Sequence, residues 1–393
     1  MEEHILKRVF LIVLDSFGIG EMPDASDYFD EGSNTIKSCA SSKYFELKNM
    51  RRMGLFNIDG VDCKEKVSEP IGAFARLAEA SRGKDTTTGH WEMAGLISKE
   101  PFPVFPNGFP DNLINDIERL TGRKVICNLP YSGTEVIKDY GRRHIDTSEL
   151  IIYTSADSVL QIAAHEDIVP LAELYSYCEK IRELCVDEYG VGRVIARPFT
   201  GRYPDFTRTS GRHDYSLKPY GKTMLDYIKE CGKSVISIGK INDIFAGEGI
   251  TESVRTSGNA EGIDRTIEYI EKDFDGIVFT NLVDFDMLYG HRNDIDGYAK
   301  ALSFFDKRLE DIVGRLKDDD ILFITADHGC DPGTVSTDHS REYVPLIIFG
   351  KCIKAGVNLG TRDTFSDIAS SILAFFGIES NLPGSSFMTE IIK

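Results

Sequence analysis

Short runs of apolar, often β-branched residues alternate along the chain with longer stretches in which apolar residues recur every three or four positions. The short runs are RVFLIVLD near the start and SVISIG, GIVFTNLVD, DILFITAD and VPLIIFG in the second half. Two of the longer stretches are YGKTMLDYIKECG and IDGYAKALSFFDKRLEDIVGRL. The short runs predict strands buried on both faces, and the longer stretches predict amphipathic helices. We therefore predict an α/β fold with a central, mostly parallel sheet flanked by helices.

Two irregular segments interrupt this alternation. KEPFPVFPNGFP contains four prolines, and TGRYPDFTRTSGRHDYSLKPYG is rich in Gly, Pro, Ser and Thr, so we expect both to be irregular crossings between domains. The block between them has helix and strand patterns of its own, including DNLINDIERLTG and ELIIYTSADS. We predict a core domain made of residues 1–99 and 217–393, with a smaller α/β cap domain inserted at residues 100–216.

Charge and cysteine content limit the partners. The 393 residues include 45 Lys and Arg against 63 Asp and Glu, a formal net charge of -18. Such a surface repels nucleic acid and anionic membranes, so an anionic small substrate would need a local positive site. The apolar run at 9–14 is too short for a signal peptide or a membrane span. The eight cysteines form no CxxC pair, which predicts reduced thiols and a cytoplasmic location.

Several predicted strands end in carboxylates or histidines. In open α/β sheets ligands bind at the carboxyl ends of the strands, and imidazole together with carboxylate suits divalent transition metals. Any one of these residues could instead cap a helix or turn. Jointly they would repel one another or stay unpaired without a cation. Asp284, on the same predicted strand as Asp286, is a candidate to support a ligand. The six candidate ligands, enough for two ions, are Asp15, Asp286, His291, Asp327, His328 and His339.

A second candidate feature is RGKDTTTGHWE, at residues 82–92. A hydroxyl in a short turn flanked by glycine, beside a basic residue and before a predicted helix, suits a nucleophile that handles phosphate. Threonines in such a turn can also serve only as capping groups. We assign no chemical role to Asp85, His90, Trp91 and Glu92, which could simply pack the turn.

Taken together, these motifs resemble the alkaline phosphatase superfamily of metalloenzymes and, within it, the phosphopentomutase family. The resemblance rests on stretches spread from end to end of the chain: VLDSFGIGEMPDA, GKDTTTGHWE, SADSVLQIAAHE, RVIARPFTG with FTRTSGRHDYS, IGKINDIFAGEGIT, NLVDFDMLYGHRND, TADHGCDP and TDHSREYVPLI. It implies an alkaline-phosphatase-like core with an inserted cap. It also implies an isomerase that interconverts ribose 1-phosphate and ribose 5-phosphate, or the 2-deoxyribose equivalents, through a phosphothreonine and a bisphosphorylated sugar.

The resemblance also assigns residues. It implies that Asp15, Asp327 and His328 bind one ion and that Asp286, His291 and His339 bind the other, with Thr86 between them as the catalytic residue. It implies substrate contacts from Asp157, Arg193 and Arg208 of the cap and from Lys240 of the core, although such arginines could equally form surface salt bridges. The expected cofactors are two divalent metal ions, which the resemblance implies to be Mn²⁺. A sugar bisphosphate, such as glucose 1,6-bisphosphate or ribose 1,5-bisphosphate, is the expected primer. Pentose phosphates are the expected partners.

Three other functions fit parts of the pattern. A cofactor-independent phosphoglycerate mutase shares the two-metal core but usually carries a serine nucleophile, whereas the candidates here are threonines. A phosphatase or phosphodiesterase could use the same metal cluster. A non-catalytic metal or sugar-phosphate binding protein would not need a hydroxyl aimed between the ions. Product analysis separates these functions, since they yield a positional isomer, free phosphate or an unchanged ligand.

Overall fold

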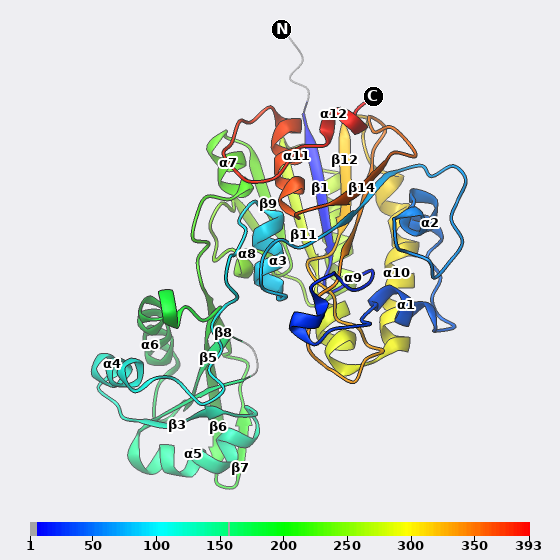
Figure 1. The fold of residues 1–393 in the computed structure, drawn as a ribbon. Helices are drawn as coiled ribbons and strands as arrows, with labels where there is room; N and C mark the ends of the chain where they lie inside the picture. The colour runs from blue at the N-terminus through cyan, green and yellow to red at the C-terminus, as the bar shows by residue number, and fades with distance from the viewer. Residues whose placement is uncertain (1–5, 156–157) are drawn as a thin grey trace. The chain divides into compact units, whose positions relative to one another are not determined.

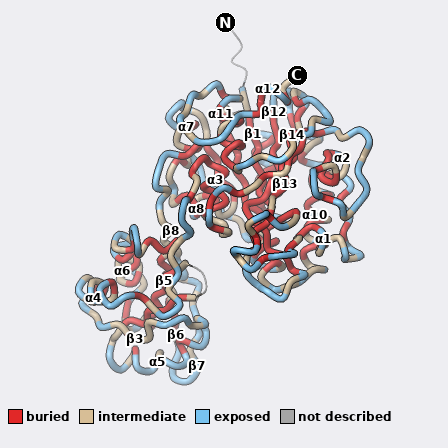
Figure 2. Tube along the Cα trace, in the orientation of Figure 1, coloured by how far each residue is buried: buried red, intermediate tan, exposed pale blue. Residues whose placement is uncertain are grey.

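The computed structural model describes residues 6–155 and 158–393, and the chain divides into two compact units (Figure 1). The core unit comprises the residues up to Pro101 and those from Pro219 onward, and the inserted unit is Phe102–Lys218. Each unit is built on its own sheet. In both, buried residues are concentrated along the strands (Figure 2).

The core unit contains an eight-stranded sheet in the order β10-β9-β11-β1-β12-β13-β2-β14. Strand β1 lies in the middle of it, between β11 and β12, and is parallel to both. Strand β13 is antiparallel to its neighbours β12 and β2, whereas the other neighbouring strands of this sheet are parallel. The predicted mostly parallel sheet and the α/β fold class are therefore confirmed. The strands are β1 (Arg8–Leu14), β2 (Ala73–Leu77), β9 (Ser234–Ile238), β10 (Glu252–Val254), β11 (Gly276–Leu282), β12 (Asp320–Thr325), β13 (Val344–Phe349) and β14 (Asn358–Arg362).

Helices of the core unit form two groups that flank this sheet (Figure 1). Helix α10 contacts the other members of one group, α1, α2 and α9. Helix α11 contacts α3 and α7 in the other group, and α3 also contacts α8. The helices are α1 (Thr35–Ala40), α2 (Lys48–Met53), α3 (Thr86–Met93), α7 (Met224–Glu230), α8 (Ile241–Ile244), α9 (Asn259–Ile270), α10 (Ile295–Val313), α11 (Ser366–Phe376) and α12 (Met388–Ile391).

The inserted unit has a six-stranded sheet in the order β3-β4-β5-β6-β7, with β8 also paired to β6. Apolar side chains of α4 and α6 join one hydrophobic cluster and those of α5 join another, so this unit has a core of its own. Its elements are β3 (Val125–Pro130), β4 (Leu150–Thr154), β5 (Val159–His165), β6 (Arg193–Arg202), β7 (Asp205–Arg208), β8 (His213–Ser216), α4 (Asp111–Thr121), α5 (Glu135–Thr147) and α6 (Leu171–Leu184).

One predicted irregular segment is wrong. The stretch at 200–221 contains the end of β6 and all of β7 and β8. Strands β6 and β7 form a hairpin in which Arg202 pairs with Asp205, so Tyr203 and Pro204 make the turn between them. Gly201 has a φ of 108°, and a Cβ there would lie 2.3 Å from the Asp205 carbonyl oxygen. The glycine and proline therefore build a tight hairpin instead of ending regular structure.

Two further observations concern the environment of the protein. No helix within 6–155 and 158–393 is both long and apolar enough to cross a membrane. All eight cysteines lie in the described part of the chain, and all are free thiols. The cytoplasmic location stays a prediction.

Candidate metal centre

Three neighbouring parallel strands bring the candidate ligands together. Strands β11, β1 and β12 end side by side, with Leu14 paired to Leu282 and Val13 paired to Thr325 (Figure 1). Asp15 directly follows β1, and Asp327 with His328 follows β12. After β11 the chain enters a π-helical turn, η4 (Phe285–Tyr289), and a 3₁₀ turn, η5 (Gly290–Arg292), which carry Asp286 and His291. His339 lies in the loop before β13.

Asp15, Asp327 and His328 form the first group, and all three are buried. The Nε2 atom of His328 lies 3.5 Å from Asp15 Oδ1 and 3.3 Å from Asp327 Oδ2. Buried donors hold both carboxylates in place. Asn281 Nδ2 donates to Asp15 Oδ2 at 2.8 Å, and the Ser16 backbone N–H donates to Asp327 Oδ1 at 2.9 Å.

Asp286, His291 and His339 form the second group. His291 Nε2 lies 3.3 Å from Asp286 Oδ2 and 3.1 Å from His339 Nε2, and His339 Nε2 lies 3.4 Å from Asp286 Oδ1. The groups adjoin, since ligand atoms of Asp286, His328 and His339 lie within 4.8 Å of one another. The structure thus brings all six predicted ligands into one cluster.

The cluster has the chemistry of a cation site. Asp15 Oδ1, Asp286 Oδ1 and Asp327 Oδ2 are buried without a hydrogen-bond partner. Burial raises the pKa of Asp15 well above its usual value, and the charges of Asp327 and Asp286 raise it further. The histidines oppose this effect at the other two carboxylates, since His339 and His291 lower the pKa of Asp286 and His328 and His90 lower that of Asp327. Leaving the buried carboxylate of Asp15 uncompensated would cost several kcal/mol. With two divalent cations bound, the charge of the ions would slightly exceed that of the three carboxylates, and the site as a whole would be positive. The residues present therefore fit a pair of ions and a bound anion.

Helix α3 places one of the three threonines at this cluster. The side chain of Asp85, the N-cap, accepts hydrogen bonds from the Thr87 and Thr88 backbone N–H groups and, at 2.6 Å, from the Thr88 hydroxyl. Thr86 Oγ1 instead lies 3.2 Å from His328 Nε2. Asp85 and Thr88 therefore cap the helix, while the hydroxyl of Thr86 is held beside a candidate ligand.

The residues left without a role fix α3 in position. His90 Nδ1 lies 2.8 Å from the Thr86 carbonyl oxygen and 3.2 Å from Asp327 Oδ2, so it joins α3 to the first group. Trp91 Nε1 donates to the carbonyl oxygen of Ile244 in α8. Glu92 accepts from the Ala80 and Ser81 N–H groups and from the Thr364 hydroxyl and Phe365 N–H beside α11.

Two supporting residues differ from the sequence prediction. Strand β11 ends at Leu282, so Asp284 does not share a strand face with Asp286. Its carboxylate accepts from the Asn259 N–H at 2.7 Å, at the start of α9. Asn281, which holds Asp15, was missed because it lies inside an apolar run, and its partner is 266 positions away in the sequence.

The predicted substrate-binding residues are divided between the units. Lys240 is the N-cap residue of α8 in the core unit, and its charge opposes the upward shift that burial causes in the pKa of Asp15. In the inserted unit Arg193 lies 3.5 Å from Asp214, and Arg208 Nε donates to the Gly133 carbonyl oxygen at 3.1 Å. Asp157 lies outside the described residues.

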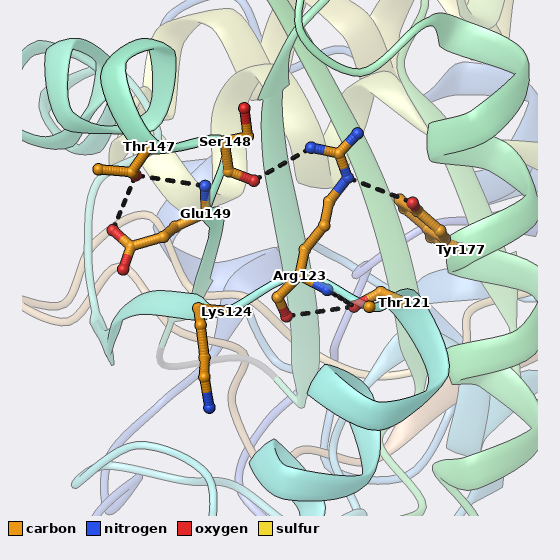
Figure 3. Close-up of a pocket in the computed structure, with 8 residues that line it drawn as sticks. Thr121, Arg123, Lys124, Thr147, Ser148, Glu149 and Tyr177 are labelled. Atoms are coloured by element: carbon orange, nitrogen blue, oxygen red, sulfur yellow. Dashed lines mark hydrogen bonds between the residues drawn. The ribbon is translucent and has the colours of Figure 1, made fainter.

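A hollow of about 560 Å³ lies elsewhere, in the inserted unit (Figure 3). The guanidinium of Arg123 in its wall already donates to the Ser148 carbonyl oxygen and the Tyr177 hydroxyl, and it pairs with Glu173. Among the predicted site residues that the structure describes, none lines this hollow, and the candidate metal ligands belong to the other unit. Its lining residues are Thr121, Gly122, Arg123, Lys124, Thr147, Ser148, Glu149 and Tyr177.

Comparison with known proteins gives closely related sequences over nearly the whole chain. The model of the Metalloenzyme superfamily matches residues 7–380. The phosphopentomutase of Lachnoclostridium phytofermentans is 61% identical, over 99% of this chain and 100% of the relative. That of Acetivibrio thermocellus is 56% identical, over 98% and 100%. Among solved structures, Leishmania mexicana phosphoglycerate mutase is 12% identical, covers 98% of each chain and has a TM-score of 0.48.

Proposed function

The chain belongs to the phosphopentomutase family of the metalloenzyme superfamily, and we propose on that premise that it interconverts α-D-ribose 1-phosphate and D-ribose 5-phosphate, and the 2-deoxyribose equivalents. The observation that carries the proposal is the position of the Thr86 hydroxyl, 3.2 Å from His328 Nε2, where the two groups of ligands adjoin. A hydroxyl held beside such a cluster suits a nucleophile that receives and returns a phosphoryl group.

In the proposed reaction Thr86 carries a phosphoryl group at rest. A free hydroxyl of the pentose monophosphate attacks the phosphorus, the bond from phosphorus to Thr86 Oγ1 breaks, and the proton of the sugar hydroxyl is released. The resulting sugar bisphosphate reorients and returns its other phosphate to Thr86. The first phosphorylation of Thr86 uses a sugar bisphosphate primer, glucose 1,6-bisphosphate or ribose 1,5-bisphosphate.

The chain's own residues orient these groups. Asp15, Asp327 and His328 would hold one divalent ion, and Asp286, His291 and His339 the other. Bound Mn²⁺ ions would stabilise the charge on the oxygens of an in-line transfer. His90 contacts the Thr86 carbonyl oxygen and Asp327, and thereby keeps the nucleophile aligned with the first group.

Positive groups retain the substrate in this proposal. Because the chain has a net charge of -18, a sugar phosphate needs local cations to bind. Lys240, Arg193 and Arg208 would supply them, and Asp157 would accept hydrogen bonds from sugar hydroxyls. The inserted unit acts as a cap that excludes water while the bisphosphate reorients.

Phosphorus NMR of the sugar phosphates tests the proposed function. Metal-free protein supplied with ribose 1-phosphate, primer and Mn²⁺ is expected to produce ribose 5-phosphate, and a chelator is expected to abolish turnover until Mn²⁺ is restored. Free phosphate as the main product would indicate a phosphatase. Unchanged ribose 1-phosphate, or full activity in metal-free protein, would contradict the proposal.

A further inference from the structure

A buried thiol lies beside the second group of ligands. The Sγ atom of Cys330 and ligand atoms of Asp286 and His291 all lie within 4.8 Å of one another. Cys330 is 1% exposed, so this thiol faces the protein interior. The sequence prediction of six ligands did not include Cys330, which is two positions after His328.

Other atoms around Cys330 point independently to a cation. Asp286 Oδ1 is buried without a hydrogen-bond partner, and Asp286 is 5% exposed. Nδ1 of His291 lies 2.6 Å from the Thr337 carbonyl oxygen and therefore carries the proton. The ring nitrogen that faces the site is therefore Nε2, which lies 3.3 Å from Asp286 Oδ2 and would be the atom that binds a metal. A carboxylate oxygen and an imidazole nitrogen are thus both available as ligands next to the sulfur.

The local backbone makes room for the thiol. A Cβ at Gly290 would lie 2.9 Å from Cys330 Sγ, so a larger residue before His291 would displace the sulfur. The Cys330 N–H donates to the Ser16 carbonyl oxygen at 3.1 Å, which fixes Cys330 beside the end of β1. The thiol donates a hydrogen bond to the Asp338 carbonyl oxygen, with 3.5 Å between sulfur and oxygen. Because a thiol is a weak donor, little is lost when this hydrogen bond is replaced by a bond to a metal.

We propose that Cys330 is an additional ligand of the second ion when that ion is thiophilic, so that this site binds Zn²⁺ or Cd²⁺ more tightly than its oxygen and nitrogen ligands alone would. The inference rests on the proposed two-metal function. Thiolate selects soft ions, whereas Mn²⁺ is well served by carboxylate and imidazole. As the metal–sulfur bond forms, the S–H bond breaks and the proton is released to solvent.

The direct test is a spectroscopic titration of the metal-free full-length protein with Cd²⁺. A cadmium–thiolate bond gives a charge-transfer band in the ultraviolet, which oxygen and nitrogen ligands do not give. We expect this band in the wild type and in the control Cys352→Ser, and its loss in Cys330→Ser. The same band in Cys330→Ser, or no band in the wild type, would overturn the proposal.

Competition between metals measures the consequence for selectivity. The ratio of the Zn²⁺ affinity to the Mn²⁺ affinity is expected to fall at least tenfold in Cys330→Ser and to stay unchanged in Cys352→Ser. An unchanged ratio in Cys330→Ser would contradict the inference.

A measurement without variants covers the case in which Cys330→Ser does not fold. X-ray absorption of the wild type loaded with zinc is expected to show sulfur at about 2.3 Å from the metal, the usual Zn–S distance. Only oxygen and nitrogen neighbours would overturn the proposal. These readouts do not depend on isomerase activity, so the inference and the proposed function can fail separately.

Discussion

At the scale of single residues, buried polar partners decide how the candidate ligands are held. The motif around Asp15 predicts a ligand, but only the structure reveals that Asn281 and Ser16 each donate to a carboxylate of the first group. These contacts join positions far apart in the sequence, so no local spacing could indicate them. Cys330 was missed for a related reason, because its place in a motif says nothing of the direction of its sulfur.

Glu342 gives a prediction about pH. It is buried, and its carboxylate accepts hydrogen bonds from the Gly20 and Thr35 N–H groups and from the Thr35 and Ser340 hydroxyls. Burial raises its pKa from 4.5 to about 7, although these hydrogen bonds oppose the shift. A folded pKa above the unfolded one means that its contribution to stability is complete below about pH 4.5 and is lost as the pH rises through about 7.

Glu342→Gln is therefore expected to remove this pH dependence. Its amide keeps one oxygen for the two N–H groups and places its NH₂ toward the hydroxyls, as the neutral acid would. Urea unfolding of the metal-free wild type and variant should give equal free energies of unfolding near pH 4.5. At pH 8 the free energy of unfolding of the variant should be about 3 kcal/mol higher than that of the wild type. If the free energies of unfolding of variant and wild type differ equally at both pH values, folding does not change the pKa of Glu342, which would contradict the prediction.

At the scale of elements, the hydrophobic pattern predicted the strands that are buried on both faces. It did not predict the structure of the turns. Strands β1, β11 and β12 are buried at every position, and their apolar runs identified them. The hairpin of β6 and β7 was missed because Gly201 and Pro204 were interpreted as breakers of regular structure. The end of β11 was placed too late, since apolar and polar residues keep alternating from Val283 to Asp286 as they would in a strand, although the strand has ended at Leu282.

Helix α3 packs so closely that one methyl group should disturb it. A Cβ at Gly89 would lie 2.0 Å from the Asp327 carbonyl oxygen, so Gly89→Ala must push α3 away from the end of β12. A displacement of about 1 Å at a reacting group can cost about 10²-fold in rate. We expect kcat for isomerisation to fall by this order while the affinity for ribose 1-phosphate changes little.

Gly192→Ala is the matched control. A Cβ there would lie 3.4 Å from the Ser158 carbonyl oxygen, an ordinary contact, so its kcat should equal that of the wild type. Steady-state kinetics of both variants checks the prediction. Wild-type kcat in Gly89→Ala would mean that the position of α3 does not limit phosphoryl transfer.

At the scale of the whole molecule, the chain forms two units with separate cores, and its net charge is strongly negative. Motifs from end to end of the chain predicted the family and the candidate ligands. They could not predict the buried hydrogen bonds around Glu92, which tie α3 to residues beside α11. These contacts depend on tertiary packing, and their partners are more than 270 positions apart in the sequence.

Retention of the bisphosphorylated sugar is the property we assign to the inserted unit. Water, at about 55 M, competes with the sugar for every phosphoryl group. Arg208→Ala is therefore expected to lower isomerisation at least tenfold and to raise the ratio of free phosphate to isomerised product. Arg119→Ala, which removes an exposed arginine of the same unit, should leave that ratio unchanged. A drop in isomerisation without a rise in the ratio would mean that Arg208 does not retain the intermediate.

The central claim is that Thr86 carries the phosphoryl group, and mass spectrometry of the protein tests it most directly. Protein incubated with Mn²⁺ and glucose 1,6-bisphosphate, then digested, is expected to contain one added phosphate on Thr86. The matched variant Thr87→Ala should carry the same modification, and Thr86→Ala should carry none and lose isomerisation. Phosphate on Thr87 or Thr88, or undiminished isomerisation by Thr86→Ala, would contradict the account.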